Sequence, residues 1–124
     1  MTEAQRGWFA RAEQALADAR LLQDAGSVEA CLNRAYYATF YAARAALAGV
    51  PEHPKSHSGT HSRFALHFVV TGRLSKDTGS LLVRAFRARQ LADYDAIILT
   101  DTDAAADALA DAERFVAAVG PLVT

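Results

Sequence analysis

The sequence has little of several features that would define a protein class. Its one cysteine, Cys31, excludes an internal disulfide and is typical of a reducing compartment, so we expect a cytoplasmic protein. No apolar run is long enough to cross a membrane, and Arg6, Arg11 and Glu13 interrupt the start of the chain, where we therefore expect no signal peptide. With a formal net charge of −1, the chain as a whole does not attract nucleic acid.

Motifs of several enzyme classes are missing as well. The sequence has no glycine-rich phosphate loop, no Walker sequence and no CxxC pair, so we expect no cofactor. The acidic residues near the C-terminus do not gather on one helix face, as metal ligands would, and we interpret them as helix-start charges and a solvated surface. They are Asp101, Asp103, Asp107, Asp111 and Glu113.

The sequence is rich in alanine, and arginine is its main cation. A hydrophobic content of 52%, raised by alanine, suits helices that pack closely. Arginine supplies nearly all of the cations, because Lys55 and Lys76 are the only lysines. Arginine makes bidentate contacts to phosphate, although the same bias is typical of a GC-rich genome. With 124 residues, the chain has enough length for one core, and we expect a single domain over residues 1–124.

Apolar residues at helical spacing, together with the breakers Gly26 and Gly72, divide the chain into five predicted helices. Short loops join them, so we predict an all-α, up-and-down bundle of about five helices. Residues 93–100 are expected to form an irregular linker. The β-branched pair Ile97 and Ile98 makes a short strand the alternative. The predicted N-caps are Thr2, Ser27, Ser56 or Ser58, Ser75, and Asp101 or Thr102.

The second predicted helix, residues 28–48, is the centre of this bundle. Between residues 33 and 47 it has no Gly or Pro, and its apolar residues lie on nearly all sides, which is typical of a buried helix. Tyr36 and Phe40 share one face, while Tyr37 and Tyr41 share the adjacent face. We expect Phe40 in the core, and we expect the tyrosine hydroxyls to have hydrogen-bond partners.

Four stretches, in this order, carry a resemblance to a known family. They are NRAYYATFYAA at residues 33–43, KSHSG at 55–59, RQLADY at 89–94 and AERFV at 112–116. The set resembles small prokaryotic HEPN domain proteins (higher eukaryotes and prokaryotes nucleotide-binding). The resemblance implies a HEPN-type helical bundle, a homodimer, and a minimal nucleotidyltransferase as partner, as in toxin–antitoxin pairs.

The first candidate site contains Lys55, His57 and His61. The two histidines are spaced i,i+4 and therefore share a helix face, as zinc ligands do, but the stretch lacks the glutamate of the protease motif and a third ligand. We therefore predict no metal site. One alternative is that one histidine caps a helix and the other lies on the surface. The interpretation that fits the family better makes Lys55 and His57 donors to a phosphate near a helix N-terminus.

The second candidate site contains Arg89, Asp93 and Tyr94. Ribonucleases of the family that the chain resembles carry an arginine, a polar neighbour and a histidine several positions later. Arg89 and Gln90 match the first two, but Asp93 and Tyr94 stand in place of the histidine. Metal-independent RNA cleavage needs a base for the 2′-hydroxyl and stabilisation of the developing negative charge. Arg89 can stabilise that charge, whereas an Asp93 beside Arg89 is a weak base.

The two candidate sites are expected to meet in one cleft. The family fold would bring the loop before the third helix near the end of the fourth, so that Lys55, His57 and Arg89 share a phosphate site. Asn33 or Arg34 would line this cleft from the central helix. The leading hypothesis is therefore a module that binds the phosphate of a nucleotide or of RNA. The alternatives are a toxin ribonuclease and a non-catalytic assembly partner of the nucleotidyltransferase.

Overall fold

The computed structural model describes residues 1–97 and 101–124. In this part of the chain all regular structure is helical and no strand is present, which confirms the predicted all-α bundle. η1 is a π-helical turn that continues α3 without a break. The elements are α1 (Glu3–Asp24), α2 (Val28–Leu47), α3 (His57–Phe64), η1 (Ala65–Val69), α4 (Lys76–Tyr94) and α5 (Thr102–Val123).

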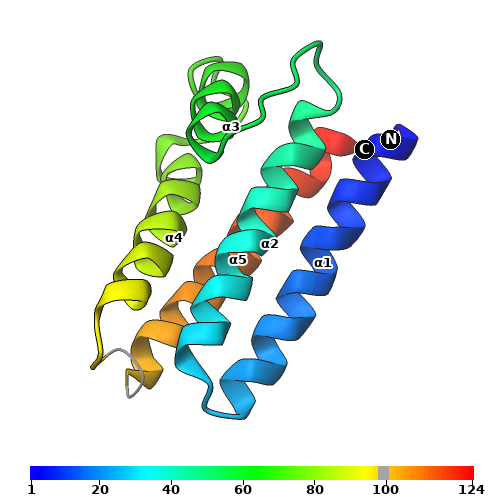
Figure 1. The fold of residues 1–124 in the computed structure, drawn as a ribbon. Helices are drawn as coiled ribbons and strands as arrows, with labels where there is room; N and C mark the ends of the chain where they lie inside the picture. Colours follow the sequence, from blue (N-terminus) through cyan, green and yellow to red (C-terminus); the bar gives the residue numbers. More distant parts are fainter. Residues whose placement is uncertain (98–100) are drawn as a thin grey trace.

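Helix α2 is central, as the sequence predicts. It packs against α1, α3, α4 and α5. In Figure 1, α1, α2 and α4 run side by side, α5 passes behind α2, and α3 lies across one end of the bundle. No described helix combines the length and the apolar character that a membrane span requires. This arrangement leaves one side of α2 between α1 and α4, opposite the side that α5 covers.

Side-chain caps start most of these helices. Thr2 belongs to a capping box at the start of α1, and Ser56, Ser75 and Asp101 each accept a hydrogen bond from the backbone N–H three residues later. These caps agree with the predicted N-cap positions. The start of α2 differs, because the side chain of Ser27 makes no capping hydrogen bond. The first N–H groups of α2 therefore lack a side-chain acceptor.

The chain turns at the predicted glycines but not at the predicted end of α4. Gly26 and Gly72 adopt the left-handed conformation, with φ of 75° and 81°, which glycine tolerates without strain. The linker was expected to begin at residue 93. Instead α4 continues to Tyr94, because no Gly or Pro interrupts it. Ile97 lies in a turn rather than in a strand, and Ile98 falls outside the described residues.

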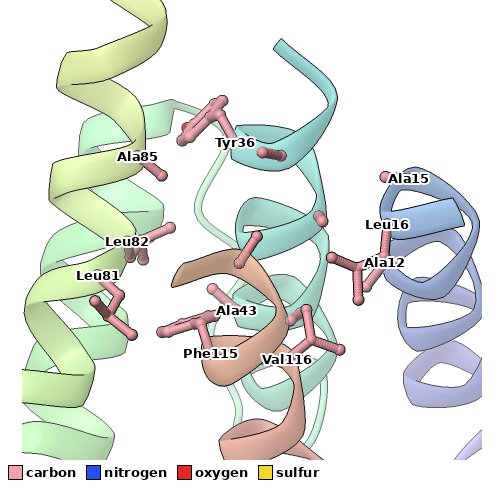
Figure 2. Close-up of a cluster of buried hydrophobic side chains, with 14 of the residues drawn as sticks. Ala12, Ala15, Leu16, Tyr36, Ala43, Leu81, Leu82, Ala85, Phe115 and Val116 are labelled. Carbon is pink, nitrogen blue, oxygen red and sulfur yellow. The ribbon is translucent and has the colours of Figure 1, made fainter. Parts of the chain in front are cut away.

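The core lies where α2 meets its neighbours. Tyr36, Phe64, Phe68 and Phe115 are almost completely buried, and small alanines let α1 approach α2 closely. Figure 2 shows Tyr36 directed from α2 toward α4, near Ala85. The prediction for Phe40 needs correction, since Phe40 is only partly buried. Its ring packs against the edge of the core, 5.8 Å from the Tyr36 ring and 4.6 Å from the His57 ring at the start of α3.

Candidate functional site

A cleft of about 670 Å³ lies between the start of α2 and the end of α4. Asn33 and Arg34 line it from α2, and Arg89 and Asp93 line it from α4. The fold thus brings together four residues that the sequence analysis singled out from two distant stretches. The remaining lining residues are Leu22, Gly26, Ser27, Val28, Glu29, Ala30 and Ala92.

Arg89 is held in this cleft by aromatic side chains. Its Nη1 donates a hydrogen bond to the Tyr37 hydroxyl at 3.2 Å, and its guanidinium carbon lies 5.3 Å from the centre of the Tyr36 ring. Its Nε is buried and has no hydrogen-bond partner among the described residues. The spacing of four residues permits an ion pair with Asp93, but none is present among the ion pairs of residues 1–97 and 101–124. Arg89 therefore keeps an uncompensated positive charge and an unused donor.

Arg34 and the start of α2 complete the positive side of the cleft. The Nε of Arg34 donates to Oδ1 of Asn33 at 3.0 Å, and its guanidinium lies 4.9 Å from the centre of the Tyr37 ring. The uncapped first turn of α2 forms part of the same wall. Backbone N–H groups and the helix dipole at such an end favour an anion. Glu29 and Asp93 also line the cleft and oppose this preference.

His57 and His61 both contact the buried hydroxyl of Tyr36. This oxygen lies 2.6 Å from Nδ1 of His57 and 3.0 Å from Nε2 of His61. Burial raises the pKa of Tyr36, although the nearby Arg89 acts in the opposite direction. Burial, followed by the charge of His57, lowers the pKa of His61 to about 4. Burial and the charge of Arg89 also lower the pKa of His57, so both imidazoles are neutral near pH 7.

The single proton of the Tyr36 hydroxyl couples the tautomers of the two histidines. The hydroxyl donates to one imidazole and accepts from the other. If it donates to His57, then Nε2 of His57 carries a proton and is a hydrogen-bond donor. If it donates to His61, then Nε2 of His57 has a free lone pair and can act as a base. The shorter distance to His57 favours the first arrangement, since O–H donors make shorter hydrogen bonds than N–H donors.

His57 and Arg89 lie around the same aromatic rings. The His57 ring centre lies 6.0 Å from that of Tyr37 and 5.9 Å from that of Phe86, and the Arg89 guanidinium lies 5.7 Å from the centre of the Phe86 ring. No histidine follows Arg89 in the sequence, yet the fold supplies one from α3. Two signals could have indicated this cluster: the i,i+4 spacing of the histidines, and tyrosines on an apolar helix that need partners.

Lys55 and Tyr94 lie elsewhere on the molecule. Lys55 is exposed in the loop before α3 and does not line the cleft. Tyr94 is 90% exposed and sits beside Arg87 and Leu91. Because five residues separate it from Arg89, the two side chains point about 140° apart around α4. Over residues 1–97 and 101–124, no group of three His, Cys, Asp or Glu side chains could hold a metal ion.

Comparison with known proteins identifies the family. The profile of the HEPN domain matches residues 5–122. A UPF0332 protein of Gloeobacter violaceus is 44% identical over 94 residues, which cover 76% of this chain and 75% of that protein. A UPF0332 protein of Thermotoga maritima is 33% identical over 116 residues, 94% of this chain and 88% of that protein. A Methanocaldococcus jannaschii protein named "Putative toxin" is 32% identical over 105 residues, 85% of this chain and 78% of that protein. The chain therefore belongs to the HEPN domain family.

Proposed function

We propose that this HEPN module binds the phosphate of a nucleotide or of RNA in the cleft between α2 and α4. The observation that carries the proposal is the state of Arg89, which has no carboxylate partner among the described residues and a buried Nε without an acceptor. Arg34 and the uncapped start of α2 face the same cleft. A phosphate oxygen would accept hydrogen bonds from the N–H groups of this guanidinium that reach the cleft and would balance its charge, and charge-assisted hydrogen bonds of this kind are about twice as strong as neutral ones.

The biological setting that we propose is a toxin–antitoxin-like pair in the cytoplasm. A HEPN relative bears the name "Putative toxin", which supports a toxin-like role for this chain. The resemblance of the four motif stretches suggests a minimal nucleotidyltransferase as the partner and a homodimer as the assembly. Co-purification with the product of a neighbouring nucleotidyltransferase gene tests the partner. Sedimentation at micromolar concentration tests the homodimer, and a purely monomeric protein would reject it.

Binding of a fluorescent adenine nucleotide to Arg89→Ala tests the cleft itself. We expect binding to weaken by about 10-fold or more, the usual loss for hydrogen bonds to a charged group. Arg84→Ala is the matched control, because Arg84 lies on the same helix but pairs with Asp111 at 2.7 Å. Equal affinities of the two variants would refute the site. A wild type that binds neither nucleotide nor RNA would leave the assembly role as the better hypothesis.

Metal-independent ribonuclease activity is the second candidate function, and the position of His57 favours it. Sequence reasoning found no base for the 2′-hydroxyl, because an Asp93 beside Arg89 is a weak base. In the structure Asp93 is exposed and Tyr94 points away from Arg89. The fold places His57 beside the rings that hold Arg89. His57 would take the proton through Nε2, while Arg89 would stabilise the charge on the phosphorane. This chemistry requires the tautomer in which the Tyr36 proton points to His61.

The assay for this second function is RNA cleavage in the presence of a chelator. We expect cleavage by the wild type to be slow, because the shorter Tyr36–His57 distance favours the donor tautomer of His57. Loss of cleavage in both His57→Ala and Arg89→Ala would establish the ribonuclease. Cleavage that survives His57→Ala would exclude His57 as the base.

A further inference from the structure

A row of side chains on α2 continues away from the cleft toward the other end of the helix. Arg34, Tyr37, Tyr41 and Arg44 follow one another at intervals of three and four residues, so they lie on one face of α2. Between Arg34 and Arg44 this face extends about 15 Å along the helix. α1 and α4 add side chains on either side. We call this surface the α2 track, and its members are Trp8, Arg11, Arg34, Tyr37, Tyr41, Arg44 and Arg89.

Every arginine of the α2 track rests on an aromatic ring. The guanidinium of Arg11 lies 4.4 Å from the centre of the Tyr41 ring and 5.1 Å from that of Trp8, and Arg44 lies 4.7 Å from Trp8. The rings themselves follow one another: the centres of Trp8 and Tyr41 are 5.9 Å apart, and those of Tyr41 and Tyr37 are 5.6 Å apart. The track is therefore a continuous series of rings with guanidiniums placed over them.

The charges of the α2 track are not neutralised. Among residues 1–97 and 101–124, no arginine of the track takes part in an ion pair, although four other arginines do. The paired ones are Arg20, Arg63, Arg84 and Arg114. Three of them, Arg20, Arg84 and Arg114, pair with carboxylates of α5. Four arginines without an ion pair among the described residues thus lie together beside partly exposed rings of α1 and α2.

We propose that the α2 track binds single-stranded RNA and leads it to the phosphate cleft at Arg34 and Arg89. This inference rests on the proposed function and names its substrate class. Guanidiniums would bind successive phosphates, while unpaired bases stack on the guanidinium planes that lie over Trp8 and Tyr41, a mode that RNA-binding proteins use. A duplex hides its base faces and cannot use the rings. A second copy of the chain fits less well, because a two-fold axis would set these unpaired arginines against their own copies.

Fluorescence anisotropy with a labelled ten-nucleotide oligouridylate tests the track. The test variant is Arg11→Gln/Arg44→Gln, and the matched control is Arg20→Gln/Arg84→Gln, which removes the same charge from ion pairs. We expect at least tenfold weaker binding and a smaller salt dependence for the test variant only. Both variants should bind a mononucleotide like the wild type. Arg11→Gln alone serves as a second variant, since Arg44 also donates to the Pro54 carbonyl and supports the loop there.

The single tryptophan provides a direct signal from the track. Because Trp8 is the only tryptophan of the chain, quenching of its fluorescence by the oligonucleotide, but not by a duplex of equal length, would support stacking at this site. Equal affinities of the two double variants, or no quenching at saturation, would overturn the inference. If Arg89→Ala abolishes nucleotide binding while the track variant keeps full RNA affinity, the proposed function stands and only the proposal that the track binds RNA is refuted. If the track variant instead dissociates a dimer at unchanged RNA affinity, the surface is an interface between copies.

Discussion

Arginines have different partners on the two sides of the bundle: carboxylates on one side and aromatic rings on the other. On the α5 side, Arg84 and Arg114 share the carboxylate of Asp111, at 2.7 and 3.5 Å, and Arg20 pairs with Glu113 at 3.2 Å. On the α2 side the arginines rest on rings that belong to the core or pack against it. The α5 pairs are surface contacts that can be lost at small cost. The α2 arginines depend on the packing beneath them, so binding and stability are expected to be coupled on that side only.

The largest expected effect is the loss of the Tyr36 ring. Tyr36→Ala removes a completely buried side chain from α2, together with the hydroxyl that contacts His57 and His61. We expect the free energy of unfolding to fall by about 3–5 kcal/mol, as for other buried aromatic residues. Urea denaturation measures this change. Phe40→Ala is the control and should cost clearly less, because Phe40 is only partly buried.

A milder variant, Tyr36→Phe, separates the role of the ring from that of the hydroxyl. Tyr36→Phe keeps the ring beneath Arg89 but removes the hydroxyl, so nucleotide binding should persist while His57 loses its tautomer control. A Tyr36→Ala protein that remains folded and binds nucleotide with wild-type affinity would contradict the coupling between core and site.

The helices and their caps could be predicted from the sequence, because they depend on local patterns. Thr2, Ser75 and Asp101 are cap residues that act within one turn, and Gly26 and Gly72 break helices by their own backbone preferences. The end of α4 could not be predicted as well. The sequence has no Gly or Pro near Asp93 that would mark the last residue of the helix, and α4 ends one residue later, at Tyr94.

The site was predicted only in part, because its geometry depends on how three helices meet. Sequence reasoning placed Arg89 with His57, Asn33 and Arg34 through a family resemblance. It also put Asp93, four residues later on the same helix, beside the Arg89 side chain. The structure pairs Arg89 with Tyr37 of α2. A spacing of four residues permits an ion pair without requiring one, and an aromatic surface from another helix competes for the guanidinium.

The second prediction concerns pH, and it follows from the neutral state of His61. Its folded-state pKa of about 4 lies below the ordinary value of 6.5, so the unfolded chain binds more protons between these two values. Stability is therefore complete above about pH 6.5 and is lost as the pH falls toward 4. We expect a loss of about 1–2 kcal/mol, less than the full linkage because the ring is partly exposed. Urea midpoints from pH 7 to pH 5 measure it.

His61→Gln isolates this contribution from other acid-sensitive groups. Glu52, whose pKa is lowered by its contacts with Arg63 and His67, affects stability only below its ordinary value of 4.5. The variant should thus show a flatter dependence between pH 7 and pH 5 than the wild type. Identical slopes would mean that His61 is not held neutral against Tyr36.

The third prediction gives the α5 side the unpaired arginine charge of the α2 side. Asp111→Asn leaves Arg84 and Arg114 without their carboxylate but provides no ring beneath them. Because Arg84 and Arg114 are largely exposed, their ion pairs with Asp111 contribute little, and the free energy of unfolding should change by less than about 1 kcal/mol. RNA affinity, measured by anisotropy, should rise less than about twofold, as expected from screened charge alone. A large gain in RNA binding would show that free arginines suffice without rings.

The smallest expected effect is a gain of binding in Asp93→Asn. Asp93 lines the cleft but forms no ion pair with Arg89 in the described part of the chain, so its charge repels a phosphate instead of orienting the arginine. Neutralising an exposed carboxylate near the anion is worth a few tenths of a kcal/mol, so affinity for the nucleotide should rise about two- to threefold at low salt. The gain should disappear at high salt, where the wild-type carboxylate is already screened. Asp107→Asn, a neutralisation on α5, should change nothing. Weaker binding in Asp93→Asn would show that this carboxylate positions Arg89, and a salt-independent change would point to altered packing of the cleft.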